Sequence, residues 1–400
     1  MVNAANMPQL SDPVQPKALP PRIVFVRQQY SPYGGGELIL DRTITAMVAR
    51  GVRVALLSRA WTGRDDIEFI RCDPRRFPRM RREIRFARAA CVRLSGEAHS
   101  IIHSYDRLPC CDVFRAGEGV HAAYLEQRAR AMTALARAVL WLSPYHRGVL
   151  ALERAMFASA RLKAVIVNSA MVADELVGHY SYPRERIHLV SNGIDLERFS
   201  PDARKAHRAA IRGRLGTDEN RPVVLFVGSG YRRKGLDVAI EAVVRSRSDA
   251  ELWVVGHDRQ PGAFETHAAR IGLAARLRMI GPSRDPLPYY AGADVLILPS
   301  LYDPFPSTVI EALACGLPAV VSQSCGSRET VARLDRGLVR DARDIEGLAQ
   351  ALRRALELAA KPATIEAARA IASEYGIDRM IDRMLSVYGQ LGATERRSRS

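Results

Sequence analysis

Short apolar runs recur along this chain, and each is followed by a loop and then by a segment with helical periodicity. The first series starts at residues 22–27 (RIVFVR), passes through a glycine-rich loop and a periodic segment at 37–50, and reaches a second run at 52–58. Further runs follow at 100–104 and 164–168, after an arginine-rich stretch with helical character. Parallel strands with covering helices produce this alternation, so the pattern predicts a Rossmann-like unit.

A second series starts after the turn Ser191-Asn192-Gly193. It contains five short apolar runs, at residues 222–228, 251–256, 277–281, 295–299 and 319–322. We therefore expect an α/β fold with two Rossmann-like domains facing each other across a central cleft, with ligands at the carboxyl ends of the strands. The helices expected near the end of the chain span residues 345–357, 362–374 and 379–391.

The expected division of the chain follows from these two series. We expect residues 22–200 to form the first domain and residues 201–375 to form the second. A helix at 376–395 crosses back to the first domain, and 396–400 are a solvated tail. Residues 1–21 contain five prolines and no apolar core of a signal peptide, so we expect a flexible leader.

Composition narrows the class of protein further. With 400 residues, 48% of them hydrophobic, the chain can bury a large core. The 59 basic residues exceed the 43 acidic ones, which gives a net charge of +16 and favours acidic partners such as phosphates or anionic lipids. Six cysteines occur without a C-x-x-C pair, which is typical of a reducing cytosol. No apolar stretch is long enough to span a membrane, so any membrane contact is expected to be peripheral.

The strongest site signal is the segment 301–316 (LYDPFPSTVIEALACG). We expect Ser307 to cap a helix that begins at Thr308, with Glu311 about one turn in. Amide groups at such a helix start bind phosphate, and the carboxylate can accept hydrogen bonds from a ribose diol. The alternative is a surface helix with an ordinary solvated glutamate.

A second signal is the loop 227–235 (VGSGYRRKG), which follows a predicted strand. Gly228 allows close approach of a ligand to the backbone, and Arg233 with Lys234 would neutralise a pyrophosphate as it leaves. A simple strand-to-helix turn with a solvated basic edge is the alternative.

Two first-domain segments could meet the ligand from the opposite side. The turn at 30–37 (YSPYGGGE) has backbone amides suited to phosphate, but it lacks the G-x-G-x-x-G pattern of dinucleotide enzymes. The segment 112–121 (DVFRAGEGVH) is expected to be turn-like, and Glu118 or His121 could orient a sugar or take up an acceptor proton. A polar loop with a hydrogen-bonded histidine explains the second segment equally well.

Taken in order, these segments resemble the retaining glycosyltransferases of family 4, which have the GT-B fold, and in particular lipopolysaccharide core glucosyltransferases. The resemblance runs from about Ile23 to about Tyr388 and also includes 167–169 (VNS) and 186–199 (RIHLVSNGIDLERF).

The resemblance implies that residues 22–200 form an acceptor- and membrane-facing domain and that residues 201–375 form a domain that binds a nucleotide sugar. It also implies a role for each matching residue. Arg233 and Lys234 match the basic pair on the donor diphosphate, Glu311 matches the ribose-binding carboxylate of the E-x7-E element, and Glu118 lies where relatives place an Asp or His near the reacting sugar. The first carboxylate of that element is Asp303 here, one methylene shorter. The other implied donor-binding positions are Gly34, Gly35, Gly228, Pro304, Phe305, Ser307 and Thr308.

The implied reaction is transfer of a hexose, with glucose from UDP-glucose as the first expectation, to a lipopolysaccharide core or another lipid-linked glycan. Attack on the front face, with the diphosphate deprotonating the acceptor, would retain the anomeric configuration without a protein nucleophile. No cofactor and no metal is expected, since the sequence has no convincing D-x-D motif and basic side chains can stabilise the leaving group. Mannosyl, galactosyl, N-acetylglucosaminyl or heptosyl transfer and nucleotide-sugar 2-epimerisation are the alternatives.

Arginines concentrate between residues 71 and 93, and residues 124–150 add an amphipathic pattern. This predicts peripheral binding to the cytoplasmic face of an anionic membrane, with contacts that include Arg76, Arg82, Trp141 and Tyr145. A nucleic-acid-binding protein is the non-enzymatic alternative, but the cluster offers chiefly Phe77 and Phe86 for stacking. We therefore expect no nucleic-acid partner.

Overall fold

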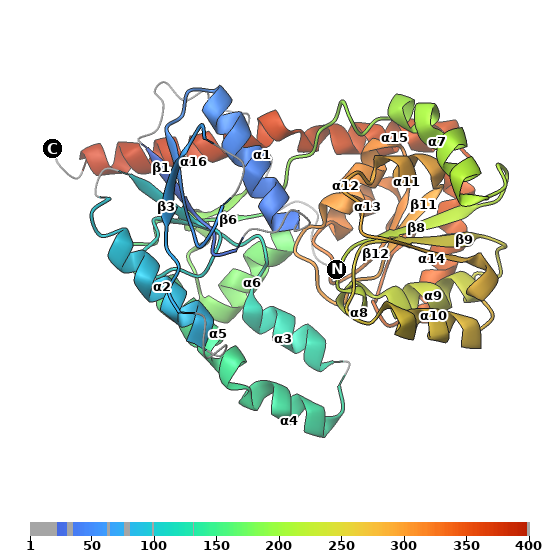
Figure 1. Cartoon of the computed structure of the whole chain (residues 1–400), viewed down its shortest axis with the longest axis horizontal. Coiled ribbons are helices and arrows are strands. Elements are labelled where there is room, and N and C mark those ends of the chain that lie inside the picture. The colour runs from blue at the N-terminus through green and yellow to red at the C-terminus, as the bar shows by residue number, and fades with distance from the viewer. Residues whose placement is uncertain are drawn as a thin grey trace.

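The computed structural model describes residues 22–29, 35–61, 65–75, 81–97, 100–130 and 132–397, without the side chains of 35–37 and 392–397. The expected leader, Gly34 and Arg76 lie outside the described residues. Two α/β domains stand side by side in Figure 1, which confirms the predicted fold class.

The first domain contains a parallel sheet of seven strands in the order β3-β2-β1-β4-β5-β6-β7. Val24 and Val26 of β1 face one hydrophobic cluster, and Ile23 and Phe25 face another, because successive side chains point to opposite sides of a strand. The sheet is therefore buried on both faces. Its strands are β1 (Ile23–Val26), β2 (Val54–Ser58), β3 (Glu68–Arg71), β4 (Ile101–Ser104), β5 (Val113–Arg115), β6 (Ala164–Val167) and β7 (Ile187–Leu189).

Helices between these strands cover the first sheet. Three of them, α3, α4 and α5, extend from its lower part in Figure 1. The helices of this domain are α1 (Gly35–Ala49), α2 (Arg82–Arg93), α3 (His121–Ala129), α4 (Ala134–Leu142), α5 (Pro144–Phe157) and α6 (Ala170–Tyr180).

The second domain repeats the design with six parallel strands in the order β10-β9-β8-β11-β12-β13. The strands are β8 (Val223–Val227), β9 (Glu251–Val255), β10 (Leu277–Gly281), β11 (Val295–Leu298), β12 (Ala319–Ser322) and β13 (Val339–Arg340). The helices are α7 (Pro201–Leu215), α8 (Tyr231–Lys234), α9 (Leu236–Arg245), α10 (Pro261–Arg270), α11 (Leu287–Gly292), α12 (Ser307–Ala314), α13 (Arg328–Leu334), α14 (Ile345–Ala359) and α15 (Pro362–Ala372).

The last helix, α16 (Ile377–Arg397), runs from the second domain back along the first (Figure 1). Arg50, directly after α1, forms ion pairs with Asp378 at 2.8 Å and Asp382 at 2.7 Å. The Tyr388 hydroxyl lies 2.5 Å from Nδ1 of the buried His103 on β4. The helix therefore contributes to the first-domain core, and it continues through residues 396 and 397, which we expected in a solvated tail.

All five strands predicted in the second series are present, with bounds close to those expected. The prediction of a turn-like segment at 112–121 holds for residues 116–120 but was wrong on either side, because Val113–Arg115 form β5 and His121 begins α3. This strand and β13 are only three and two residues long, too short to show a period.

Candidate active site

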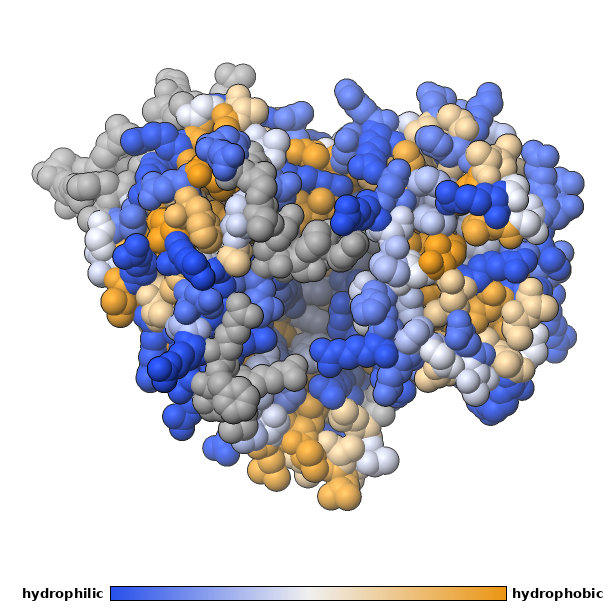
Figure 2. All heavy atoms as spheres, viewed as in Figure 1, coloured by the Kyte–Doolittle hydropathy of each residue, from blue (hydrophilic) through white to orange (hydrophobic). Residues whose placement is uncertain are grey.

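The carboxyl ends of the strands in both domains face the space between them, and Figure 2 shows the surface hollowed there. In the second sheet the strand order reverses between β8 and β11. A crevice forms at such a point because the connections that follow the two strands diverge. The loop before Arg233 and Lys234 follows β8, and the loop that carries Asp303 follows β11, so the fold brings these predicted residues together.

Lys234 and Asp303 form an ion pair through Nζ and Oδ2. The two side chains are only 12% and 8% exposed, so the pair is largely shielded from solvent. Gly228 leaves room for the lysine stem, since a Cβ there would lie 3.3 Å from Lys234 Cγ. Arg233 lies beside this pair and donates from Nη1 to the carbonyl of Tyr302 at 3.3 Å. Two cations thus line the cleft at the end of β8.

The helix predicted after Asp303 is α12, but the prediction that Ser307 caps it was wrong. Pro306 occupies the N-cap and Ser307 is the first helical residue, because the proline ring fixes the backbone that enters the helix. Thr308 Oγ1 is buried and has no hydrogen-bond partner among the described residues. Phe305 is buried in the second-domain core, and its carbonyl accepts a hydrogen bond from Asn192 at 3.1 Å.

Glu311 is buried, which excludes the alternative of a solvated surface glutamate. Its Oε2 accepts a hydrogen bond from the Tyr290 hydroxyl at 2.9 Å. Burial raises the pKa of Glu311, against the opposing influence of Arg42 on α1 and of the bond from Tyr290. Arg42 comes from the first domain, and its Nη1 is buried without a hydrogen-bond partner in the part of the chain that the structure describes. A cation of one domain therefore acts on the carboxylate of the other.

On the first-domain side, Arg27 follows β1 and bridges two carboxylates. It lies 3.5 Å from Asp106, which follows β4, and 2.8 Å from Glu118, which follows β5. Burial raises the pKa of Asp106 to about 6 despite Arg27. Desolvation in the cleft opposes ionisation of Glu118, but Arg27 and Arg107 outweigh it and lower its pKa. Arg233 of the second domain adds to this effect, so Glu118 faces the basic pair across the cleft as an ionised group.

His121 begins α3 and lies close to Glu153 and His146. Its backbone amide donates to Glu153 at 2.9 Å, and its Nε2 lies 3.1 Å from Nδ1 of His146. Burial and then Arg107 lower the pKa of His121 to about 4. The ring is therefore neutral at physiological pH and suits hydrogen bonding better than proton uptake.

The sequence did not point to Arg27, Asp106, Tyr290 or Tyr302. Arg27 directly follows β1 and Asp106 is the second residue after β4, at the strand-order reversal of the first sheet, so their position was a usable signal. Tyr290 and Tyr302 have no local pattern that marks them, because their partners come from distant parts of the chain.

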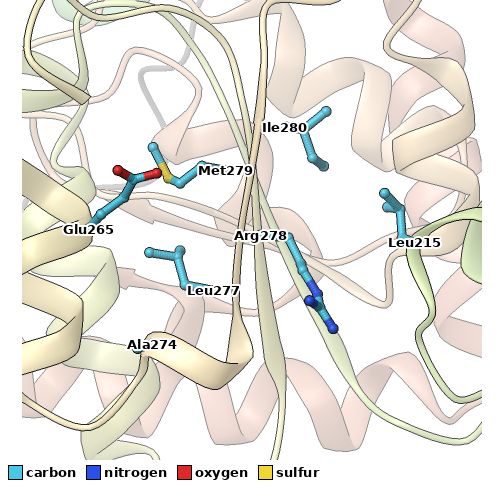
Figure 3. Close-up of a pocket in the computed structure, with 7 residues that line it drawn as sticks. All are labelled: Leu215, Glu265, Ala274, Leu277, Arg278, Met279 and Ile280. Carbon is cyan, nitrogen blue, oxygen red and sulfur yellow. The ribbon is translucent and has the colours of Figure 1, made fainter. Parts of the chain in front are cut away.

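A separate hollow of about 540 Å³ lies along the edge strand β10 (Figure 3). None of the predicted site residues lines it. Its lining residues are Leu215, Glu265, Ala274, Leu277, Arg278, Met279 and Ile280. Among the described residues, no group of three or more His, Cys, Asp or Glu side chains could hold a metal ion.

Comparison with known families agrees with this geometry. Residues 33–198 match the model for Glycosyltransferase Family 4, and residues 207–372 match the model for Glycosyl transferases group 1. The chain belongs to the family-4 glycosyltransferases. It is thus an enzyme that transfers a sugar, and the resemblance drawn from its motifs is confirmed.

One relative is similar to nearly the whole chain. The lipopolysaccharide glucosyltransferase WaaG of Escherichia coli (strain K12) is 26% identical over 342 residues, which span 84% of this chain and 89% of WaaG. The crystal structure of WaaG, described as involved in lipopolysaccharide biosynthesis, superposes with a TM-score of 0.78, covering 92% of this chain and 99% of WaaG at 25% identity. The GT-B fold is thereby confirmed.

Two other relatives match over a shorter part of the chain or at lower identity. A D-inositol 3-phosphate glycosyltransferase of Geodermatophilus obscurus is 32% identical, but the match spans only 57% of this chain and 53% of that protein. HepE of Anabaena, solved in complex with UDP-glucose, superposes with a TM-score of 0.70 at 19% identity, covering 93% of this chain and all of HepE. At this identity the similarity shows the fold alone.

The residues expected at a membrane differ in their exposure to solvent. Leu135, Val139, Trp141 and Leu142 of α4 are exposed, whereas Tyr145 on α5 is half-buried. The amphipathic stretch at 124–150 is divided among α3, α4 and α5, and Leu125 and Leu140 pack together in a small core between these helices. Arg82 pairs with Glu83 at 2.8 Å. No helix in the described ranges is long and apolar enough to cross a membrane.

Proposed function

We propose that this enzyme transfers a hexose, with glucose from UDP-glucose as the first candidate, to a lipopolysaccharide core or another membrane-associated glycan, with retention of configuration and without a metal. The observation that carries the proposal is the position of Arg233 and Lys234 at the strand-order reversal, between Asp303 and the opposing Glu118. Side-chain cations in that place can stabilise a leaving diphosphate, as a divalent ion would in other transferases.

In the proposed reaction the bond between the sugar C1 and the diphosphate breaks, and the acceptor oxygen bonds to C1 on the same face. The acceptor proton passes to a diphosphate oxygen. Lys234 has three donors, so it can keep its bond to Asp303 while it binds the diphosphate. Glu311 would accept the ribose hydroxyls, and the ionised Glu118 would orient the sugar or the acceptor hydroxyl. His121 would act as a neutral hydrogen-bonding group.

Support for the donor comes from relatives. WaaG is named a glucosyltransferase, and HepE has been solved with UDP-glucose. Mannose, galactose, N-acetylglucosamine and heptose donors remain the alternatives, since sugar choice depends on a few hydroxyl contacts. A nucleotide-sugar 2-epimerase would change the sugar in the absence of an acceptor, whereas a transferase releases nucleotide and forms a larger product.

A panel of nucleotide sugars tests the proposal, read by thermal shift and by slow donor hydrolysis in excess EDTA. We expect UDP-glucose to raise the apparent melting temperature by mass action and to release UDP. The Arg233→Ala variant should lose both effects. The matched control is Arg232→Ala, because Arg232 lies on the same short helix α8 but is exposed. Equal responses from the two variants would contradict the proposal.

We further propose that α4 brings the enzyme to the cytoplasmic face of an anionic membrane, where a lipid-linked acceptor is available. Three apolar side chains on this helix, Leu135, Val139 and Leu142, are largely exposed, and Arg137 lies among them. Apolar burial combined with attraction of basic residues to anionic lipids favours such interfacial binding. Phe86 is buried in the core, which removes one aromatic ring that nucleic-acid stacking would need.

Vesicle flotation tests this second proposal. The native protein should float with phosphatidylglycerol vesicles more than with phosphatidylcholine vesicles. Replacing Leu135, Val139 and Leu142 with serine should abolish flotation without unfolding the protein, since these side chains are exposed. Equal recovery in the soluble fraction from both vesicle types would defeat the proposal.

A further inference from the structure

The side chain of Tyr302 belongs to the second domain by sequence but packs in the core of the first. It follows β11, yet it is only 3% exposed and lies in a hydrophobic cluster whose other buried members all precede residue 183. Its ring centroid is 6.1 Å from that of Tyr124 on α3. An aromatic ring of one domain is thus inserted into the other.

The Tyr302 hydroxyl makes two hydrogen bonds to the first domain. It accepts one from the backbone amide of Val120 at 2.9 Å and donates one to Oε2 of Glu175 at 2.6 Å. Val120 precedes α3 as its N-cap residue, and Glu175 lies on α6. Val120 and Glu175 also interact directly, and loss of the hydroxyl would take one hydrogen bond from each of them in a water-poor region.

Gly119 permits this close approach. A Cβ at this position would overlap the Tyr302 hydroxyl and would lie 2.9 Å from Pro304 Cγ. The backbone of Gly119 also has a φ of +75°, which side-chain-bearing residues rarely adopt. The segment after Glu118 is therefore shaped to receive the loop that carries Tyr302.

The same loop is held at its other positions. Arg233 donates to the carbonyl of Tyr302 at 3.3 Å, the amide of Gly326 donates to the carbonyl of Asp303 at 2.8 Å, and Asn192 donates to the carbonyl of Phe305 at 3.1 Å. Glu118 directly precedes Gly119, and Asp303 directly follows Tyr302. The hydroxyl therefore connects the two segments that carry the facing carboxylates of the cleft.

We propose that Tyr302 is a positioning residue, whose hydroxyl holds the Glu118 segment of the first domain and the Asp303 segment of the second in register for sugar transfer. The inference rests on the proposed function, because register affects turnover only if both segments act on one substrate. Small misplacements of groups held by binding energy reduce turnover strongly. Donor affinity, which depends on Lys234, Arg233 and Glu311, should be much less sensitive.

The test compares Tyr302→Phe with Tyr182→Phe, a matched control. Tyr182 is also buried, and its hydroxyl donates to the carbonyl of Leu162 at 3.3 Å within the first domain. We expect Tyr302→Phe to lower kcat about tenfold while the KM for the donor and the Kd of UDP change by less than about twofold. Tyr182→Phe should leave kcat unchanged.

Two further measurements keep the outcome interpretable. Hydrogen exchange of the Val120 amide should accelerate in Tyr302→Phe and not in Tyr182→Phe, whether or not the transferase substrate is known. Glu175→Gln retains an acceptor for the tyrosine, so it should preserve more kcat than Tyr302→Phe, and the double variant should lose no more than Tyr302→Phe alone.

An active wild type with equal kcat in Tyr302→Phe and Tyr182→Phe would overturn the inference. Absence of transfer by the wild type, with accelerated exchange at Val120, would instead contradict the proposed function.

Discussion

Replacing Lys234 with alanine should lower both the stability and the turnover of this enzyme. The change removes the partner of Asp303, which is 8% exposed and would be left as a shielded, unpaired carboxylate. Breaking a buried pair in this way costs about 3–5 kcal/mol of the free energy of unfolding. Loss of a charge that stabilises the leaving group should lower kcat by a factor of about 10²–10³, or about 3–4 kcal/mol of transition-state stabilisation.

The double variant Lys234→Ala with Asp303→Asn distinguishes the two effects. Neutralising the orphaned carboxylate should recover most of the lost stability in urea unfolding, because the two residues are coupled. Turnover should stay low, since the cation is still missing. Activity would be followed as UDP release from UDP-glucose, with Arg232→Ala as the control for charge alone. Recovery of turnover in the double variant would refute the view that Lys234 acts on the diphosphate.

Three further predictions concern titration, the donor site and a disulfide. Burial raises the pKa of Glu175 from its ordinary 4.5 to about 7. The stability that Glu175 contributes is therefore fully present below pH 4.5 and is lost as the pH rises to about 7, by up to about 3 kcal/mol. Denaturant midpoints of Glu175→Gln, measured from pH 5 to 8, should no longer show this decline. Glu311→Ala leaves the Tyr290 hydroxyl without its acceptor and should weaken UDP binding about tenfold or more by calorimetry, whereas an unchanged Kd would remove Glu311 from the donor site. Cys91 and Cys110 form a disulfide across a sequence separation of 19. Reduction of this disulfide should lower the free energy of unfolding in urea by about 3 kcal/mol. An unchanged free energy of unfolding in the presence of reductant would contradict the prediction.

The disulfide was not anticipated from the sequence. The absence of a C-x-x-C pair favoured reduced cysteines, but Cys91 on α2 and Cys110 after β4 become neighbours only through the sheet. Spacing along the chain carries no information on such a pairing. Cys72, Cys111, Cys315 and Cys325 are free and buried, in agreement with reduced thiols at those positions.

The sequence predicted best the elements that can be recognised from their own residues alone. Val223–Val227 is uniformly apolar and Ala319–Ser322 is apolar except for its serine, because both faces of a parallel strand are buried, and their bounds matched closely. By contrast β7 and β13 are short and only half-buried, so they lack an apolar run. Their position depends on pairing with β6 and β12.

The same distinction holds for the candidate site, where some residues have a local sequence pattern and others depend on tertiary packing. Arg233, Lys234 and Glu311 follow strands in recognisable patterns, and the structure places them at one end of the second sheet. The contacts that cross between domains, from Tyr302 to Glu175 and from Arg42 towards Glu311, involve residues with no shared local signal. Whether the first domain contributed Glu118 to the same cleft was decided by tertiary packing alone.

Calorimetric titration of UDP in excess EDTA tests the central claim, that side-chain cations in this cleft hold the diphosphate, most directly. The wild type should bind UDP with the same Kd in EDTA as in magnesium, and Arg233→Ala and Lys234→Ala should each weaken binding about tenfold or more, consistent with the loss of a charge-assisted contact. Binding that requires magnesium, or that is unchanged in both variants, would contradict the claim.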